Sequence, residues 1–251
     1  MLLHDGLIPH ITFSKTQILL ITAIVGTTIS PYLFFWETSQ EVEEQISSGL
    51  TTVASRRGTT PPEIKKMRID VWTGMFLSNM VMFFIIAVCA HTLFTHGITN
   101  INTASDAAEA LVPFAGPWAK YLFAIGIIGT GMLAIPVLAG STSYAISESF
   151  GWKEGLYRKL KQARAFYGVI IVSIIVGILI NFIGIDPIKA LIYSAIANGI
   201  VAPIIIIMIV LISGNKKVMG EYKNSHLGNS LGWIITILMS ITALAAIYSL
   251  F

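Results

Sequence analysis

The sequence GTTISPYLFFWE, which begins at Gly26, combines residues that can bind a cation with one that breaks a helix. Pro31 has no backbone N–H and disfavours a helical conformation in the residue before it, so the pattern predicts a break near Gly26–Pro31. The broken stretch would offer backbone carbonyls and the hydroxyls of Thr27 and Ser30, and Glu37 adds a carboxylate farther along. Oxygen atoms of these kinds are ligands for hard cations such as Mg²⁺.

Two interpretations of this stretch stay open on residue types alone. Backbone carbonyls freed at membrane depth are costly unless something binds them, which favours an ion site. A proline kink repaired locally by Ser and Thr hydroxyls would need no ion. Glu37 is either an acid within a span, placed on the same face as Ser30 and lining an inner exit, or the first solvated residue of the run ETSQEVEEQ. We expect Glu41, Glu43 and Glu44 to form a solvated face.

The composition predicts an all-α integral membrane protein with a single transmembrane domain over residues 1–251. Hydrophobic residues make up 55% of the 251 residues and charged residues only 12%, whereas soluble domains average about 25% charged residues. A spanning helix needs about 20 apolar residues. Six runs meet this requirement, at about residues 16–36, 71–94, 120–147, 165–185, 189–213 and 229–251.

The basic residues predict the orientation of these spans. Of the 16 Lys and Arg residues, 13 lie in the connections after the first, third and fifth spans, which places these connections in the cytoplasm. The segment 95–117 is then an external connection, and the chain starts outside. We therefore expect the chain to be the C-terminal portion of a longer transporter.

Other functional classes find no support in the sequence. It contains no HExxH metal site, no P-loop and no Gly-x-Ser-x-Gly elbow, so we expect no enzyme. The basic residues lie in the connections between the spans, so the net charge of +3 does not indicate nucleic-acid binding. Asn198, followed by Gly199 and Pro203, marks a second weakened helix. Its amide oxygen could reach a cation or make a hydrogen bond between helices.

Two motifs resemble those of the Nramp family of proton-coupled divalent-metal transporters. GTTISPYLFF resembles the unwound stretch of the family's sixth helix, and KKVMGEYKN, at Lys216–Asn224, resembles the motif before its eleventh helix. The six spans are similar in order and spacing to helices six to eleven. The resemblance implies a LeuT-like fold, of which this chain would hold the second inverted repeat plus one extra helix. It also implies a missing N-terminal half of five helices as partner.

The chain departs from the family pattern at the residues that the resemblance assigns to transport. Ser30 stands where the family has its metal-binding Met, and Thr27 where it has an Ala whose carbonyl faces the ion. Tyr32 and Glu37 stand where the family has two histidines associated with proton movement and gating. Asn198 falls near a tenth-helix Gln that can reach the metal, although its spacing to the next proline differs.

The resemblance implies uptake of divalent metal cations, with the ion as substrate and no cofactor. Because a hydroxyl replaces the thioether, we expect Mg²⁺ or Mn²⁺ and weak discrimination against Ca²⁺. Proton coupling stays open because both histidines are replaced. The alternatives are an amino-acid or amine transporter of the same architecture, and an inactive or truncated membrane subunit. The expected location is a lipid bilayer, as a multi-pass protein of the cell membrane, in particular a bacterial inner membrane.

Overall fold

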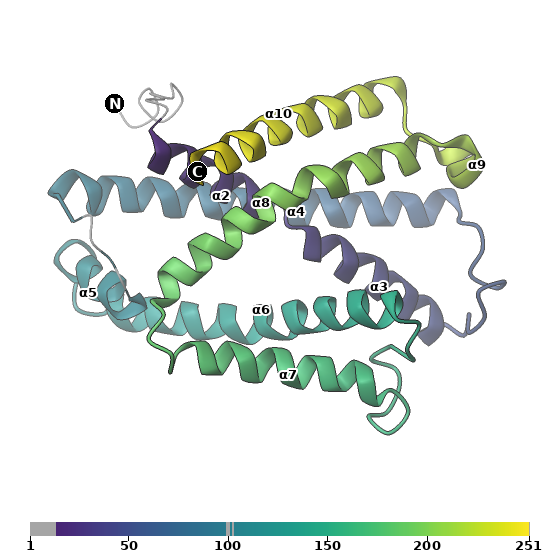
Figure 1. The fold of residues 1–251 in the computed structure, drawn as a ribbon, viewed down its shortest axis with the longest axis horizontal. Helices are drawn as coiled ribbons and strands as arrows, with labels where there is room; N and C mark the ends of the chain where they lie inside the picture. Colours follow the sequence, from purple (N-terminus) through teal and green to yellow (C-terminus); the bar gives the residue numbers. More distant parts are fainter. Residues whose placement is uncertain (1–13, 99–100, 102, 251) are drawn as a thin grey trace. The chain divides into compact units, whose positions relative to one another are not determined.

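The computed structural model describes residues 14–98, 101 and 103–250, without the side chains of Thr95 and Leu250. The described part is built of helices joined by turns and loops (Figure 1). In chain order the longer helices are α2 (Lys15–Thr28), α3 (Pro31–Ser47), α4 (Pro61–Thr92), α5 (Ala104–Ala115), α6 (Ala119–Ser149), α7 (Arg164–Ile180), α8 (Pro187–Gly214) and α10 (His226–Leu250). Short helical turns are η1 (Phe94–His96), α9 (Lys216–Met219) and η2 (Gly220–Tyr222).

The chain divides into two compact units, and the division falls inside α3 between Phe34 and Phe35. We call the first the α2 unit, whose described residues are 14–34 and 187–250. The second, the α6 unit, has described residues between 35 and 186. The first turn of α3 therefore belongs to the α2 unit and the rest of α3 to the α6 unit.

In the α2 unit, helices α2, α8 and α10 pack against one another (Figure 1). The backbones of α2 and α8 approach most closely at Gly26 and Gly199, because neither residue has a side chain to hold them apart. A Cβ atom at Gly26 would overlap the carbonyl oxygen of Ala195 and the backbone N of Gly199. The fully buried Thr22 hydroxyl lies 3.0 Å from the Ile18 carbonyl oxygen of its own helix and 3.1 Å from the Thr242 carbonyl oxygen, so it shares its proton between α2 and α10.

Apolar side chains fill the space on both sides of this crossing. One buried cluster joins Ala23 of α2 to Ala195 and Ile196 of α8. A second lies farther along α8 and includes Met239 of α10, with Val25 packed against it. Burial of apolar surface on each side of the crossing fixes the position of α2 up to the residue where the helix ends.

In the α6 unit, α7 runs beside α6, and α5 packs against α6. The buried Ser143 hydroxyl donates to the Phe166 carbonyl oxygen at 2.5 Å, and the Phe166 ring is fully buried. Helix α4 begins at two prolines after Thr60, whose N–H donates to the Glu63 carboxylate at 2.7 Å. Its 18-residue apolar window has no buried residue.

Among the described residues, five helices are long and apolar enough to cross a membrane, with α2 and α3 together counted as one broken span. Each predicted span except the fourth overlaps one of these helices, and the bounds of the spans themselves stay a prediction. Helix α7 has 17 residues and ends at Ile180 rather than at 185, which gives it a length of about 26 Å. The segment 95–117, expected to be a plain connection, contains α5, capped by the Thr103 hydroxyl on the Asp106 N–H at 3.1 Å.

We predict that Gly26→Ala destabilises the protein, because the added methyl group meets backbone atoms that cannot rotate away. The expected cost is about 1–3 kcal/mol, as for an overpacked core. Thermal unfolding in detergent micelles measures it. Gly74→Ala is the matched control, since a Cβ at Gly74 on α4 has nothing within 4 Å. Equal stability of the two variants would contradict the close crossing.

Candidate functional site

The helix break lies at Ile29 and Ser30, between the end of α2 at Thr28 and the start of α3 at Pro31. Ile29 has φ −116° and ψ 82°, outside the helical region. Pro31 cannot donate a hydrogen bond to the carbonyl of Thr27, four residues earlier. The structure therefore has the interruption that the proline predicted.

Ser30 lies at the centre of the break and is only 1% exposed. Its Oγ lies 3.0 Å from the Thr27 carbonyl oxygen and 3.2 Å from the Gly26 carbonyl oxygen. A hydroxyl group has one proton, so it can donate to only one of these carbonyls at a time. The Ser30 lone pairs and the second carbonyl keep acceptor capacity, which is the property that a cation ligand needs.

Thr27 offers its backbone carbonyl, and not its side-chain hydroxyl, as a candidate ligand at the break. The Thr27 hydroxyl donates to the Ile24 carbonyl oxygen at 2.8 Å, and the side chain is exposed. The neighbouring Thr28 hydroxyl donates to the same carbonyl at 2.8 Å. These two hydroxyls bond a carbonyl inside α2, whereas the hydroxyl next to the carbonyl that Pro31 leaves without a donor is that of Ser30.

Helix α8 also contains a proline near the point where it crosses α2, and this proline removes a backbone hydrogen bond. Gly199 packs against the backbone of α2, and Pro203, four residues later, has no N–H to give to the Gly199 carbonyl. Helix α8 nevertheless continues through Pro203. Asn198 is half-buried and adjoins Gly199 in sequence. The α2 unit thus brings together Gly26 and Gly199 at a point flanked by the predicted ligands Ser30 and Asn198.

The two predicted gating residues fall in different units. Tyr32 is half-buried in the first turn of α3, within the α2 unit. Glu37 is exposed in the α6 unit, where it lines a pocket of about 400 Å³ between α3 and the residues before and within α4. Glu41, Glu44, Glu63 and Asp70 line the same pocket. The exposure of Glu37 among other acids agrees with its interpretation as the first solvated residue after the span. That Glu37 lies on the same helix face as Ser30 stays a prediction.

Carboxylates do not surround the break. Within residues 14–98, 101 and 103–250, no group of three or more His, Cys, Asp or Glu side chains is arranged to hold a metal ion. Any cation at the break would therefore bind carbonyl, hydroxyl and amide oxygens from this chain. Such neutral ligands leave most of the ion's charge unbalanced, so a carboxylate from elsewhere would be needed to bind it tightly.

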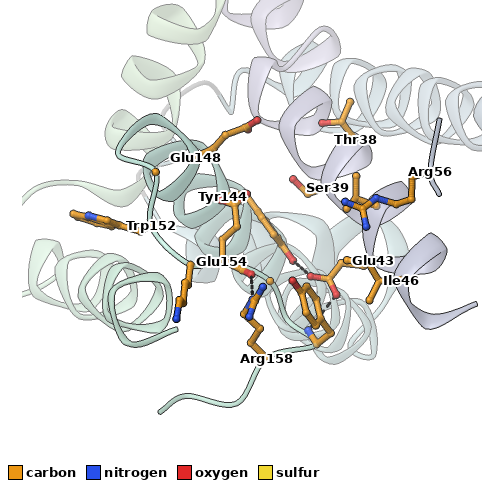
Figure 2. Close-up of a pocket in the computed structure, with 15 residues that line it drawn as sticks. Thr38, Ser39, Glu43, Ile46, Arg56, Tyr144, Glu148, Trp152, Glu154 and Arg158 are labelled. Atoms are coloured by element: carbon orange, nitrogen blue, oxygen red, sulfur yellow. Dashed lines mark hydrogen bonds between the residues drawn. The ribbon is translucent and has the colours of Figure 1, made fainter. Parts of the chain in front are cut away.

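The prediction of a solvated acidic face is right for Glu41 and Glu44 and wrong for Glu43. Glu41 and Glu44 are exposed. Glu43 is half-buried, and its carboxylate accepts a hydrogen bond of 2.6 Å from the Tyr144 hydroxyl on α6 (Figure 2). Its partners lie about 100 residues away in sequence, so only the three-dimensional structure reveals them. Spacing offered one signal: Glu43 lies seven residues after Trp36, on the same helix face.

The fold and the break together define a multi-pass α-helical membrane protein with a discontinuous span. Residues 2–249 match the family described as Nramp, natural resistance-associated macrophage protein-like. The chain belongs to this family.

Curated relatives in bacteria are similar along nearly the whole chain. A protein of Caldanaerobacter subterraneus subsp. tengcongensis is 27% identical over 235 residues, covering 93% of this chain and 51% of the relative. One of Deinococcus radiodurans is 23% identical, covering 93% and 50%. One of Mycobacterium tuberculosis is 24% identical, covering 97% and 52%. Each is named divalent metal cation transporter MntH, a transporter and not an enzyme. This chain spans about half the length of these relatives.

We predict that Ser30→Ala destabilises the protein by about 1 kcal/mol, because a carbonyl at the break loses its hydroxyl donor. Thermal unfolding in detergent should show a midpoint lower by about 2–4 °C. Thr27→Val is the control, since that hydroxyl is exposed and bonds only within its own helix. A Ser30→Ala variant as stable as the parent would mean that the hydroxyl does not satisfy these carbonyls.

Proposed function

We propose that this chain is the C-terminal portion of a transporter that takes up divalent metal cations, and that the helix break forms its half of the ion site. The break between α2 and α3 carries this proposal, because it places the buried Ser30 hydroxyl within 3.2 Å of the carbonyl oxygens of Gly26 and Thr27. Membership of the Nramp family and relatives named divalent metal cation transporters support the ion class. The proposed location is the cell membrane, in particular a bacterial inner membrane.

The proposed site consists of the carbonyl of Thr27, the hydroxyl of Ser30 and the amide oxygen of Asn198. All three are neutral oxygen ligands, which suit hard cations such as Mg²⁺ and Mn²⁺. A thioether at position 30, which the family resemblance implies for other members, would instead favour softer ions. We therefore propose Mg²⁺ or Mn²⁺ as the substrate, with weak discrimination against Ca²⁺.

The other half of the site is proposed to come from an N-terminal portion of five helices. This chain covers only about half of each relative, and neutral ligands alone leave the ion's charge unbalanced. The resemblance implies an Asp and an Asn from the first helix of that portion. A carboxylate from this source would supply the charge that the break lacks.

Proton movement is proposed to depend on Glu37, the one titratable acid of this chain at a position where the family resemblance places a proton-linked histidine. Glu37 is exposed in an acidic pocket, so protons can reach it from water. Tyr32, at the other such position, carries a phenol in place of the imidazole.

The first prediction of this proposal concerns ion choice. In the chain joined to the N-terminal half that its relatives carry, Ser30→Met should raise the preference for Cd²⁺ or Mn²⁺ over Mg²⁺ by about tenfold, or about 1.4 kcal/mol. Competitive uptake into proteoliposomes and calorimetric titration of each ion measure it. Ser47→Met, at the exposed C-terminal end of α3, is the control. If Ser30→Met leaves the ion preference unchanged, the proposed site is wrong. Absence of uptake by the parent protein would favour the alternative of an inactive subunit.

The second prediction concerns proton coupling. Under an imposed pH gradient, Glu37→Gln should reduce gradient-driven Mn²⁺ uptake about tenfold or more, because an amide cannot carry the proton. Uptake driven by the metal gradient alone should fall much less. Glu41→Gln is the control, since Glu41 lines the same pocket. If the gradient drives both variants equally, Glu37 has no role in proton movement.

A further inference from the structure

The Glu43 carboxylate joins three parts of the α6 unit that are distant in sequence. Its Oε1 accepts hydrogen bonds from the Tyr144 hydroxyl and from the Leu156 N–H, each at 2.6 Å. Its Oε2 accepts one from the Tyr157 N–H at 3.1 Å. Figure 2 shows Glu43 of α3 pointing toward Tyr144 of α6. We call these four residues the Glu43 clamp.

Aromatic packing holds α3 and α6 together two helical turns before the clamp. The Trp36 ring of α3 lies against Gly140 of α6, where a Cβ atom would overlap the ring. Trp36 also meets the Tyr144 ring edge to face, with centroids 6.3 Å apart. Tyr144 in turn packs on Phe166 of α7 at 4.8 Å. The clamp is therefore the polar end of a continuous contact between α3, α6 and α7.

The loop between α6 and α7, residues 150–163, is folded around the clamp. The Trp152 N–H donates to the Ser147 carbonyl at 2.8 Å, and the Tyr167 hydroxyl donates to the Arg158 carbonyl at 2.7 Å. These bonds fix the two ends of the loop. Between them, the N–H groups of Leu156 and Tyr157 point at the carboxylate of Glu43.

The surroundings indicate that Glu43 and not another acid organises this loop. The pocket beside the clamp, about 450 Å³ in volume, is also lined by charged residues of each sign: Arg56, Glu148, Lys153, Glu154 and Arg158. Glu154 Oε2 is buried without a hydrogen-bond partner among the described residues. Burial raises the pKa of the Glu154 carboxyl, and the nearby Glu148 raises it further. By contrast, hydrogen bonds engage both oxygens of Glu43.

The geometry of the clamp requires an acceptor at each of the two oxygens of residue 43. A carboxylate accepts hydrogen bonds at both oxygens, whereas a glutamine amide replaces one oxygen by a donor. In Glu43→Gln, the new NH₂ group would face an N–H or O–H that also needs an acceptor. In Glu43→Ala, the Tyr157 N–H loses the acceptor that it has in the described structure.

We propose that Glu43 is a positioning residue, which fixes α3 on α6 and on the loop that follows α6. The division between the two units lies at Phe34–Phe35, just before the clamped part of α3. The clamp thus sets the position of the helix that continues from the proposed ion site; this consequence for transport rests on the proposed function.

Amide hydrogen exchange of the 251-residue chain in detergent tests the clamp without any need for transport. We expect peptides that contain Leu156 and Tyr157 to exchange about tenfold faster in Glu43→Gln and in Glu43→Ala. Glu44→Gln is the matched control, since Glu44 is the exposed neighbour on the same helix. Peptides from Lys216–Asn224 in the α2 unit should not change in any variant.

Unchanged exchange at Leu156 and Tyr157 in Glu43→Gln would overturn the clamp. If Glu43→Ala raises exchange throughout the chain, that variant has unfolded. The two single variants Glu43→Gln and Tyr144→Phe then decide the test instead. Tyr144→Phe keeps the buried ring and removes one donor, so we expect a smaller increase than in Glu43→Gln. An increase confined to the loop and to α3 supports the proposal.

Uptake kinetics distinguish a positioning role of Glu43 from a merely structural one. They are measured on the chain joined to the N-terminal half. Glu43→Gln should lower the maximal rate of Mn²⁺ uptake about threefold or more, with the KM and the ion preference unchanged. Ser30→Met should instead change the ion preference. An unchanged maximal rate, despite faster exchange in the loop, would overturn the positioning role. Absence of uptake in the parent would overturn the proposed function, while the exchange experiment still decides the clamp.

Discussion

The structure depends on one constraint: a helix that stops at membrane depth must still satisfy its backbone carbonyls. Pro31 removes a donor from the span, and the Ser30 hydroxyl is the group that replaces it at the carbonyls of Gly26 and Thr27. This repair is partial, because one proton serves two acceptors. The close contact between Gly26 and Gly199 holds the weakened stretch against α8, where Pro203 leaves another carbonyl without its helical donor. The same shortage of donors that makes the break costly is what the proposed cation site relies on.

The ligand types at the break also limit which chemistry it can perform. Hydroxyl, carbonyl and amide oxygens bind hard cations weakly, and none of them carries charge. The half-site proposed at the break could select by size and hydration but could not hold an ion tightly by itself. This chain spans about half the length of each of these relatives, and the apolar window of α4 has no buried residue. The exposed surface of α4 is suited to lipid or to a further set of helices.

Sequence alone was sufficient for the features that follow from local chemistry. Pro31 predicted the break, and runs of apolar residues predicted long apolar helices, because proline geometry and hydrophobic length act on the chain directly. Two features were missed for identifiable reasons. Helix α5 is short and lies in a polar connection, and its capping by Thr103 and Asp106 is a signal that could have been used. Glu43 looked solvated because its partners, Tyr144 and the 156–157 amides, are remote in sequence.

The two halves of the broken helix are held by interactions of different physical kinds. Helix α2 is fixed by backbone contact at Gly26 and by the buried hydrogen bond from Thr22 to Thr242, both inside an apolar environment. Such packing has discrete arrangements and yields only by a concerted shift of helices. Helix α3 is fixed at its far end by hydrogen bonds to the Glu43 carboxylate, beside a pocket lined by charged residues. The aromatic contact of Trp36 with Tyr144 adds an apolar part to this second attachment. Each half of the broken helix is therefore held within its own unit: α2 by close backbone contact, and α3 by an aromatic contact that ends in a carboxylate.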